Sequence, residues 1–503
     1  MTAAATLADA FDGLCAGQPG RVAVREGGHD LTYAQLLEWS RRISRAIDPL
    51  VRAPGQRIAL MAPNSAAFVA GFFAAARAGA VVGPVNPGYG SHDLTSHLND
   101  LDAVALLADA TSLERARPTL EALPRAPALF EVSAAHGARA LRSGTTAGEP
   151  LPAIAGPPLL QQYTSGSTGT PKRVIRTHAN LLSELECLRR TFAATEADRF
   201  LGVAPFFHVN GLVRTMLTSM YTGATLYPVA EFRRREITTL LTAERITFLG
   251  GVPQIFAILG QTPLRGHVDL SSLRLVFSSS APLTRADASR FRDQYGIVIR
   301  QLYGSTETGT VSFNRDADAE SSQESVGQAL EGVRVEVLDS EGRALGPDEE
   351  GELAIASPFA TAGYHGNPEA TAESFRNGFY FSGDLGIVAP DGSIRLTGRK
   401  KLLINRGGFK VNPYEVEDVI KLHPKVAEVV VFGTPSPSGD DAVCCAIVST
   451  TSCTAEEILL HCKERLADFK IPARVEFRAA LPKSPAGKIL RGQLSASATS
   501  RPS

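Results

Sequence analysis

The chain has 503 residues, which is enough for more than one domain, each with a hydrophobic core of its own. Hydrophobic residues make up 44% of the chain and charged residues 20%, as in an ordinary soluble globular protein. The net charge of −1 gives no support to a nucleic-acid-binding surface or a strongly acidic partner.

Neither the N-terminus nor the most apolar run has the pattern of an export signal or a membrane span. Residues 1–17 lack the basic stretch of a signal peptide. Residues 66–85 are interrupted by Gly79 and Pro84, which favours a helix followed by a buried strand. We therefore expect a cytoplasmic protein with no membrane partner.

The six cysteines are not spaced as metal ligands, because no Cys-x-x-Cys pair occurs. Cys444 and Cys445 lie in an apolar, strand-like run, and neighbours on a strand point to opposite faces. We expect buried, reduced thiols; a metal site or a disulfide is the alternative.

Short apolar runs alternate with helical segments in the N-terminal part. Strands are predicted at 21–25, 57–61, 80–85 and 103–107. A helix is predicted at 66–79, capped by Asn64 or Ser65. This βαβ pattern favours a mainly parallel sheet. Residues 122–158 are rich in Pro, Ala and Gly, and they are predicted to be a surface connection.

The stretch from Tyr163 to Lys172 combines hydroxyl side chains, glycines and a lysine. Glycine lets successive N–H groups point inward, and the hydroxyls and the lysine add donors and positive charge, so the stretch suits a polyphosphate. It differs from the common nucleotide loop because two residues separate Gly169 from Lys172. A Ser/Gly-rich surface loop is the alternative. The candidate phosphate-binding residues are Thr164, Ser165, Gly166, Ser167, Thr168, Gly169 and Lys172.

The alternation of strands and helices resumes after this loop. Strands are predicted at 200–204, 225–229, 247–250 and 275–278. From 333 to 355 alternating strands with Gly/Asp turns predict a β-rich subdomain, and a short α+β segment follows, with a helix at 413–422 and a strand at 427–432. We predict an α/β fold with a large N-terminal domain, residues 1–398, and a small mobile C-terminal domain, residues 399–503.

Six short motifs follow one another along the chain. They are the phosphate loop, Phe206-Phe207-His208, Tyr303-Gly304-Ser305-Thr306-Glu307, Tyr380-Phe381-Ser382-Gly383-Asp384, Gly398-Arg399-Lys400-Lys401 running to Glu415, and Pro482-Lys483-Ser484-Pro485-Ala486-Gly487-Lys488. In this order they resemble the adenylate-forming superfamily, which includes acyl- and aryl-CoA synthetases, firefly luciferase and peptide-synthetase adenylation domains. The resemblance covers essentially the whole chain.

The resemblance implies an ATP site. Glu307 would bind Mg²⁺, since a hard carboxylate oxygen suits a magnesium ion that bridges phosphates. Tyr303 would lie against the adenine ring, and Asp384 would accept hydrogen bonds from the ribose hydroxyls. Thr164, Glu307 and Lys488 are expected to be catalytic, with Lys488 bridging the attacking carboxylate and the α-phosphate. Further expected nucleotide contacts are Ser279, Ser280, Ala281, Gln301, Leu302, Gly304, Ser305, Thr306 and Arg399.

The resemblance also implies an acid site and a moving small domain. His208 would gate the route between the acid and the thiol channel, with simple packing among aromatic rings as the alternative. Lys401 would be the hinge, and Gly407 and Gly408 would line the thiol tunnel. Arg173 stands where the family usually has a glycine. The other expected acid contacts are Asn210, Gly211, Arg214, Gly251, Ser280, Gly304 and Gly309.

The implied reaction is the ligation of an acid to a thiol at the expense of ATP. The carboxylate attacks the α-phosphate of Mg-ATP to give an acyl-adenylate and pyrophosphate, and a thiol then displaces AMP. Coenzyme A is the expected co-substrate, with an amine or a carrier-protein thiol as the alternative acceptor. An inactive nucleotide-binding module is the alternative from another class. We expect a monomer or homodimer that binds no nucleic acid.

The segment after His208 is predicted to be a helix whose first turn, by the resemblance, lines the acyl pocket. Asn210 and Arg214 are four residues apart and would share a face of that helix. An unpaired guanidinium there would be costly, and a second carboxylate or an oxo group on the substrate would satisfy it. Pairing of Arg214 with a protein carboxylate or with solvent is the alternative. We hypothesise a small dicarboxylic or oxo-substituted acid rather than a long fatty acid.

Overall fold

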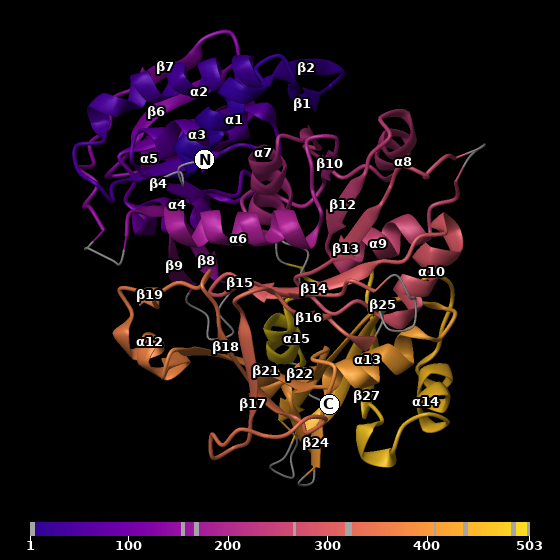
Figure 1. The fold of residues 1–503 in the computed structure, drawn as a ribbon. Helices are drawn as coiled ribbons and strands as arrows, with labels where there is room; N and C mark the ends of the chain where they lie inside the picture. The colour runs from indigo at the N-terminus through magenta and orange to yellow at the C-terminus, as the bar shows by residue number, and fades with distance from the viewer. Residues whose placement is uncertain are drawn as a thin grey trace.

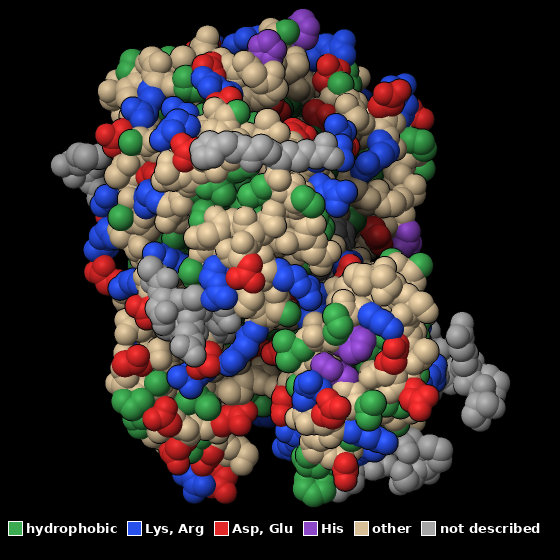
Figure 2. Space-filling model, turned by 90° about the vertical axis from the view of Figure 1, so that its right-hand side faces the viewer, with side chains coloured by type: hydrophobic (Ala, Val, Ile, Leu, Met, Phe, Trp, Pro, Cys, Tyr) green, Lys and Arg blue, Asp and Glu red, His purple; other side chains and the backbone are tan. Residues whose placement is uncertain are grey.

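The computed structural model describes residues 6–151, 156–164, 171–264, 268–316, 324–406, 409–435, 441–483 and 489–499. Two large sheets with their helices form the upper part of the molecule in Figure 1, and the orange to yellow C-terminal part lies below them. Basic and acidic side chains are intermingled over the face shown in Figure 2, as the near-zero net charge suggests. None of the helices described is both long and apolar enough to cross a membrane.

An eight-stranded sheet contains both ends of the phosphate loop. Its spatial order is β19 (Tyr364–His365), β9 (Lys172–Thr177), β8 (Pro158–Thr164), β4 (Val81–Pro84), β3 (Arg57–Met61), β5 (Ala105–Ala108), β6 (Ala128–Ser133) and β7 (Gly137–Arg142). Its middle pairs are parallel, whereas β8–β9, β9–β19 and β6–β7 are antiparallel. The β8–β9 register places Thr164 opposite Lys172, one at each end of the loop.

A nine-stranded sheet lies beside the first. Its order is β16 (Gln328–Ala329), β15 (Gly309–Phe313), β14 (Arg300–Ser305), β13 (Leu275–Ser278), β12 (Phe248–Gly251), β10 (Arg199–Gly202), β11 (Thr225–Pro228), β1 (Val22–Glu26) and β2 (His29–Thr32). Strands β1, β11, β10, β12, β13 and β14 pair in parallel. The carboxyl ends of β12, β13 and β14 therefore share one edge, which is where open α/β sheets bind their ligands.

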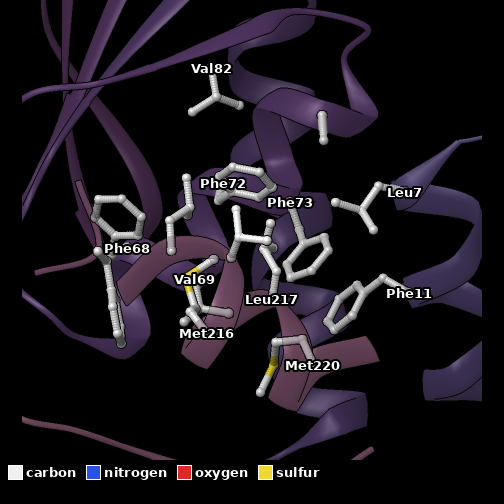
Figure 3. Packing of buried hydrophobic residues seen from close by; sticks show 14 of the residues in the cluster. Leu7, Phe11, Phe68, Val69, Phe72, Phe73, Val82, Met216, Leu217 and Met220 are labelled. Carbon is white, nitrogen blue, oxygen red and sulfur yellow. The ribbon is translucent and has the colours of Figure 1, made fainter. Parts of the chain in front are cut away.

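The main hydrophobic core is formed by helices packed between and against these sheets (Figure 3). In it the Phe11 and Phe73 rings stack with centroids 3.8 Å apart, and Phe68 meets Phe206 edge-on at 5.7 Å. Helix α3 (Ala66–Arg77) is buried along almost its whole length, so its apolar sequence reflects a position inside the protein. The other described helices that precede the five-stranded sheet, some of them packed in separate hydrophobic clusters, are α1 (Leu7–Gly17), α2 (Tyr33–Ile47), η1 (Asp48–Leu50), α4 (Ser91–Leu101), α5 (Ala110–Ala122), α6 (His178–Thr191), η2 (Asn210–Leu217), α7 (Thr218–Thr222), α8 (Arg234–Ala243), α9 (Pro253–Gly260) and α10 (Arg285–Tyr295).

A five-stranded antiparallel sheet precedes the small C-terminal part. It consists of β17 (Arg334–Leu338), β18 (Gly351–Ala356), β20 (Phe375–Arg376), β21 (Phe379–Val388) and β22 (Ile394–Arg399), with α12 (Pro368–Ser374) before β20. The C-terminal elements are η3 (Lys400–Leu402), β23 (Ile404–Arg406), β24 (Phe409–Val411), α13 (Pro413–Lys421), β25 (Val426–Pro435), β26 (Asp441–Ser449), α14 (Ala455–Lys463), η4 (Asp468–Lys470), β27 (Arg474–Phe477) and α15 (Arg491–Thr499). A buried ion pair of 3.4 Å between Lys421 and Asp287 joins α13 to α10.

The predicted fold class is confirmed: the chain has α/β sheets, a β-rich part and a small α+β C-terminal part. Strand β3 occupies its predicted range, and Ser65, rather than Asn64, is the N-cap of α3. All six cysteines are free thiols, and all but Cys453 are buried. The prediction for 122–158 was wrong, because this range contains β6 and β7, and β6 pairs in parallel with β5 in the sheet. Its Pro, Ala and Gly content concealed a short run of buried residues.

Candidate active site

Three sheets contribute to the candidate nucleotide site (Figure 1). The eight-stranded sheet supplies Thr164 and Lys172, the nine-stranded sheet supplies the ends of β13 and β14, and the five-stranded sheet supplies β21. Side-chain hydrogen bonds join one sheet to another here. Two of them end on Glu307 and Asp384, the carboxylates that the sequence predicts to contact the metal and the ribose.

Glu307 lies in the turn between β14 and β15, and its side chain is buried. The Tyr364 hydroxyl, from β19, donates a 2.8 Å hydrogen bond to Glu307 Oε1. Burial and the charge of Glu307 raise the pKa of Tyr364, so its hydroxyl stays protonated and remains a donor. The Nζ of Lys172 lies 4.4 Å from the centroid of the Tyr364 ring. The predicted phosphate-binding lysine and metal-binding glutamate are thus neighbours on either side of one tyrosine.

Asp384 is held by two residues that the sequence also singled out. The Tyr303 hydroxyl donates a 2.7 Å hydrogen bond to Asp384 Oδ2, and Arg399 Nε lies 3.4 Å from Oδ1. The register of β21 and β22 pairs Asp384 with Arg399. Burial, and then the Asp384 carboxylate, raise the pKa of Tyr303 well above its ordinary value, so this tyrosine too remains a donor. Contact of Tyr303 with adenine stays a prediction.

The other predicted nucleotide contacts follow β13 or lie along β14. Ser280 has a φ of +77°, a left-handed conformation that is uncommon for a residue with a side chain and often marks a functional turn. Ser279 is buried beside it, and Ala281 is exposed. The Leu302 side chain belongs to the main core. Half-buried positions are Thr164, Gln301, Gly304, Ser305 and Thr306.

The segment after His208 is a π-helix, η2, rather than the regular α-helix that we predicted. Asn210 Nδ2 donates a 3.2 Å hydrogen bond to the carbonyl oxygen of Gly251, at the end of β12. The His208 ring lies 4.7 Å from that of Phe207. Single π turns are frequent at functional sites. Here the π turn directs Asn210 and Arg214 toward the carboxyl ends of neighbouring strands.

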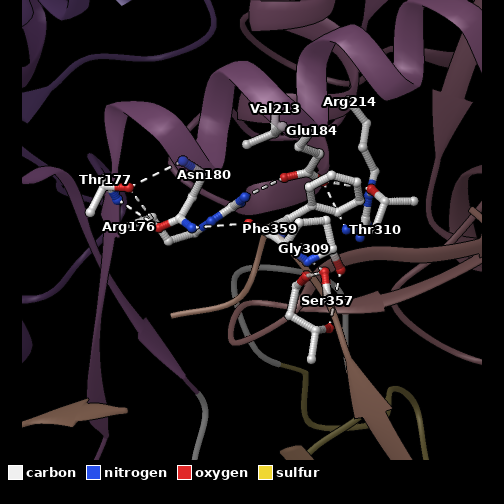
Figure 4. Close-up of polar contacts among 12 residues, drawn as sticks. Arg176, Thr177, Asn180, Glu184, Val213, Arg214, Gly309, Thr310, Ser357 and Phe359 are labelled. Atoms are coloured by element: carbon white, nitrogen blue, oxygen red, sulfur yellow. Dashed lines mark hydrogen bonds and ion pairs between the residues drawn. The ribbon is translucent and has the colours of Figure 1, made fainter. Parts of the chain in front are cut away.

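Arg176, Glu184, Thr310 and Arg214 form a buried charge network (Figure 4), which Ser279 extends through a hydrogen bond to Arg214. Arg176 Nη2 donates to Glu184 Oε2 over 2.5 Å, and the Thr310 amide and hydroxyl donate to Oε1 over 2.8 and 2.7 Å. Arg214 Nε donates to the Thr310 hydroxyl over 3.0 Å, and Nη1 donates to the Ser279 hydroxyl over 3.2 Å. The network therefore connects β9, α6, β15, η2 and the loop after β13.

The pKa values of Glu184 and Arg214 are both shifted by their surroundings, and both groups stay charged at neutral pH. Burial raises the pKa of Glu184, but the charges of Arg176 and Arg214 and the Thr310 hydrogen bond lower it by more. The net result is a pKa below the ordinary value. Burial lowers the pKa of Arg214 to about 10, although Glu184 opposes this change. Gly309, with a φ of +70°, leaves room for the glutamate, since a Cβ there would lie 2.8 Å from Glu184 Oε2.

Some predicted residues cannot be placed relative to the site. Ser165, Gly166, Ser167, Thr168, Gly169, Gly407, Gly408 and Lys488 lie outside the described residues. Gly211 is buried at the start of η2, and Lys401 is exposed in η3. Their roles, and the boundary between 1–398 and 399–503, stay predictions.

The sequence reasoning missed Tyr364, Arg176, Glu184 and Thr310. Tyr364 carries no recognisable motif, because its contact with Glu307 joins residues far apart in the chain. Glu184 did carry a signal: it follows Leu181 by three residues and precedes Leu188 by four, so it lies on the buried face of α6. A charged residue on such a face requires a buried partner.

Comparison with known proteins gives matches over nearly the whole chain. The family model for AMP-binding enzymes matches residues 11–365, and the model for the AMP-binding enzyme C-terminal domain matches residues 415–488. An oxalate–CoA ligase of Arabidopsis thaliana is 32% identical over 97% of both chains. ATP-bound MatB from Rhodopseudomonas palustris has a TM-score of 0.86 at 26% identity, over 98% of this chain and 99% of its own. The amide bond synthetase McbA from Marinactinospora thermotolerans has a TM-score of 0.85 at 25% identity, over 97% of this chain and 99% of its own.

Replacing Glu184 by glutamine tests the buried charge network. Glu184→Gln leaves two buried guanidinium groups without a counter-charge, so we expect the free energy of unfolding to fall by about 3–5 kcal/mol at pH 7. The control Glu196→Gln changes an exposed glutamate and should stay within about 0.5 kcal/mol of the wild type. Denaturant unfolding measures both variants.

The same comparison has an expected pH dependence. Because folding lowers the pKa of Glu184, its contribution to stability is present above the ordinary value of 4.5 and is lost as the pH falls through the folded-state pKa. The difference between wild type and Glu184→Gln should therefore shrink in acid. A difference below about 1 kcal/mol at pH 7 would contradict the role assigned to Glu184.

Proposed function

The chain belongs to the AMP-binding enzyme family, and on that premise we propose that it is an ATP-dependent, AMP-forming acid–thiol ligase. It activates a carboxylic acid as an acyl-adenylate, releases pyrophosphate and passes the acyl group to coenzyme A. The observation that carries this proposal is the match over 97% of the chain to a relative named as a CoA ligase. The two family models, for AMP-binding enzymes and for their C-terminal domain, agree with it. The grouping of Lys172, Glu307 and Asp384 from three sheets supports it.

The first step needs positioning and charge stabilisation more than a protein nucleophile. A substrate carboxylate oxygen bonds to the α-phosphorus of ATP, the bond from that phosphorus to the bridging oxygen breaks, and pyrophosphate leaves. Lys172 and the loop that it ends would bind the phosphates. Asp384 would accept from the ribose hydroxyls, with its carboxylate oriented by Tyr303 and Arg399. Lys488 would offset the negative charge that develops between the two reactants.

The residues present fit a magnesium ion at Glu307. Tyr364 hydrogen-bonds to Oε1, and no described residue hydrogen-bonds to the second carboxylate oxygen. Such an oxygen is the hard ligand that Mg²⁺ prefers, together with phosphate oxygens and water. A bound Mg²⁺ would neutralise phosphate charge; Tyr364 would hold the glutamate in place.

In the second step a thiol sulfur bonds to the acyl carbon, the bond from that carbon to the phosphate oxygen breaks, and AMP leaves. We propose that the small domain, residues 399–503, rotates about Lys401 between the two steps and brings Gly407 and Gly408 to the thiol. Lys401 suits a hinge because it is exposed in a short 3-10 turn between β22 and β23.

An amine acceptor is the second candidate, because the amide bond synthetase McbA is among the similar solved structures. A carrier-protein thiol is a further possibility within the same chemistry. The inactive-module alternative is disfavoured, because Lys488, Glu307 and Asp384 are all present. The cytoplasmic location and the monomeric or homodimeric state stay predictions.

Pyrophosphate release tests the proposed function directly. With ATP, Mg²⁺ and a panel of acids, we expect release that depends on the acid, and multiple turnovers when coenzyme A is added. Simple amines in place of coenzyme A should not sustain turnover. No release with any acid, from a folded protein, would favour the inactive module, and amide formation without thioester formation would favour the amine ligase.

The lysine near the C-terminus should matter for one half-reaction only. Lys488→Ala should nearly abolish formation of acyl-AMP from ATP, because the charge that offsets the developing phosphate negativity is lost. Thioester formation from supplied acyl-AMP should survive, and the exposed-lysine control Lys463→Ala should keep both steps. Equal loss of both half-reactions in Lys488→Ala would refute the assignment.

Proline at position 401 should slow thioester formation, whereas alanine should not. Lys401→Pro fixes φ near −65° and removes a backbone donor, so it should slow thioester formation at least about 10-fold while adenylation is largely kept. Lys401→Ala keeps a free backbone and should behave as wild type. Single-turnover assays measure the two steps separately. Unchanged thioester formation in folded Lys401→Pro would show that Lys401 is not the hinge.

A further inference from the structure

Arg214 is almost completely buried, with 1% of the residue's surface exposed. It projects from η2 between the nine-stranded sheet and α6 (Figure 4). The alternative that it reaches solvent is therefore excluded. Within the described part of the chain no carboxylate oxygen lies within ion-pair distance of its guanidinium, so it has no direct acidic partner there.

Its guanidinium group is only partly satisfied. Nε and Nη1 donate to the hydroxyl oxygens of Thr310 and Ser279. Nη2 is buried and donates to none of the described residues. A buried donor without an acceptor costs about 1–3 kcal/mol, and more when it carries charge. Arg214 Nη2 is thus a binding group that the described protein leaves unused.

The buried charge network also has an unbalanced charge. Among the described residues, the charges that act most strongly on Arg214 are those of Glu184 and Arg176, so within this network two positive charges share one negative charge. Glu184 accepts from Arg176 directly, and it reaches Arg214 only through the Thr310 hydroxyl. One net positive charge remains in a region of low dielectric, where a buried charge normally has a partner.

The unpartnered Nη2 of Arg214 faces Gly304, a residue of the stretch predicted to contact the nucleotide and the acid. A Cβ added to Gly304 would lie 2.6 Å from Nη2, so the guanidinium lies against the backbone of the Tyr303–Glu307 stretch. Gly304 is half-buried, so this part of β14 is not sealed in the core. Because Gly304 has no side chain, nothing on this residue covers the Nη2 edge.

We infer that Arg214 binds the second carboxylate of a short dicarboxylic acid through Nη2, and so selects the substrate of the ligase. This inference rests on the proposed function. A second carboxylate supplies both missing features, an acceptor for Nη2 and a negative charge for the network. A neutral oxo group supplies only the acceptor, and a hydrocarbon chain supplies neither. Arg214 thus acts as a specificity-determining residue, while the other carboxylate reacts with ATP.

Matched substrate pairs test this in the wild-type enzyme. An isopropyl group has the shape of a carboxylate but no charge, so the pairs are oxalate and isobutyrate, malonate and isovalerate, and succinate and 4-methylpentanoate, with pyruvate as the oxo acid. We expect kcat/KM from pyrophosphate release to favour at least one dicarboxylate over its partner by about 100-fold or more, because an unsatisfied buried polar group discriminates strongly.

Variants of Arg214 separate recognition from structure. Arg214→Met should lose at least about 100-fold for the preferred dicarboxylate while its isopropyl partner is unchanged or improved. Arg214→Lys keeps the charge and should keep part of the preference. Arg234→Met changes an exposed arginine and should alter neither member of the pair. A purely structural role for Arg214 would lower both members of the pair equally.

The outcomes distinguish this inference from the proposed function. No pyrophosphate release with any acid would overturn the function itself. Release that is equal for both members of every pair, or greater for the isopropyl acids, would overturn the inference and leave the function in place. Preference for pyruvate over all the dicarboxylates would also overturn it, in favour of an oxo acid. If Arg214→Met fails to fold, the wild-type pairs and Arg214→Lys still decide.

Discussion

The buried ion pair between Arg176 and Glu184 is the contact on which the arrangement of the site depends. Arg176 belongs to the eight-stranded sheet and Glu184 to α6, and Thr310 of the nine-stranded sheet binds the same carboxylate. A buried pair adds little net stability, because desolvation offsets its attraction, but breaking it is expensive. The pair and the two Thr310 hydrogen bonds together connect the two sheets through α6. Each of these sheets supplies part of the candidate nucleotide site, so the network connects the two sides of that site.

Two tyrosines make the same kind of contact at the candidate site: each donates a hydrogen bond to a carboxylate. Tyr364 donates to Glu307, and Tyr303 donates to Asp384, in each case from one sheet to the next. The pKa of each tyrosine is raised by burial and by the carboxylate that it contacts, so each remains a donor and keeps its carboxylate oriented. Carboxylates fixed before ligand binding lose little entropy when a metal ion or a ribose arrives. The hydrogen bonds that join the sheets therefore also hold the two carboxylates in place for a ligand.

The sequence predicts this protein well where information is local. Buried strands are continuous apolar runs, so β3 is recovered as predicted; the motif order singles out Glu307 and Asp384, whose roles stay predictions. It fails at β6, where a six-residue strand lies in a range of strand-poor composition. Tyr364 was missed because only the folded chain brings it to Glu307, and no spacing rule encodes that contact. The burial of Glu184 could have been predicted from the sequence, since a glutamate on the apolar face of a helix requires a buried partner.

The α-helix predicted for the segment with Asn210 and Arg214 was wrong, because the segment is a π-helix, and a pocket-facing position of both residues stays a prediction. Residues four apart share a face of an α-helix because a turn takes about 3.6 residues. The wider turn of η2 keeps Asn210 and Arg214 on neighbouring directions, but it sends Asn210 to the end of β12 and Arg214 to Ser279 and Thr310. A π-helix, an unpaired guanidinium nitrogen and an excess positive charge all reduce stability. Their coincidence in one short segment, next to Gly304, is what a site retained for its ligand would show.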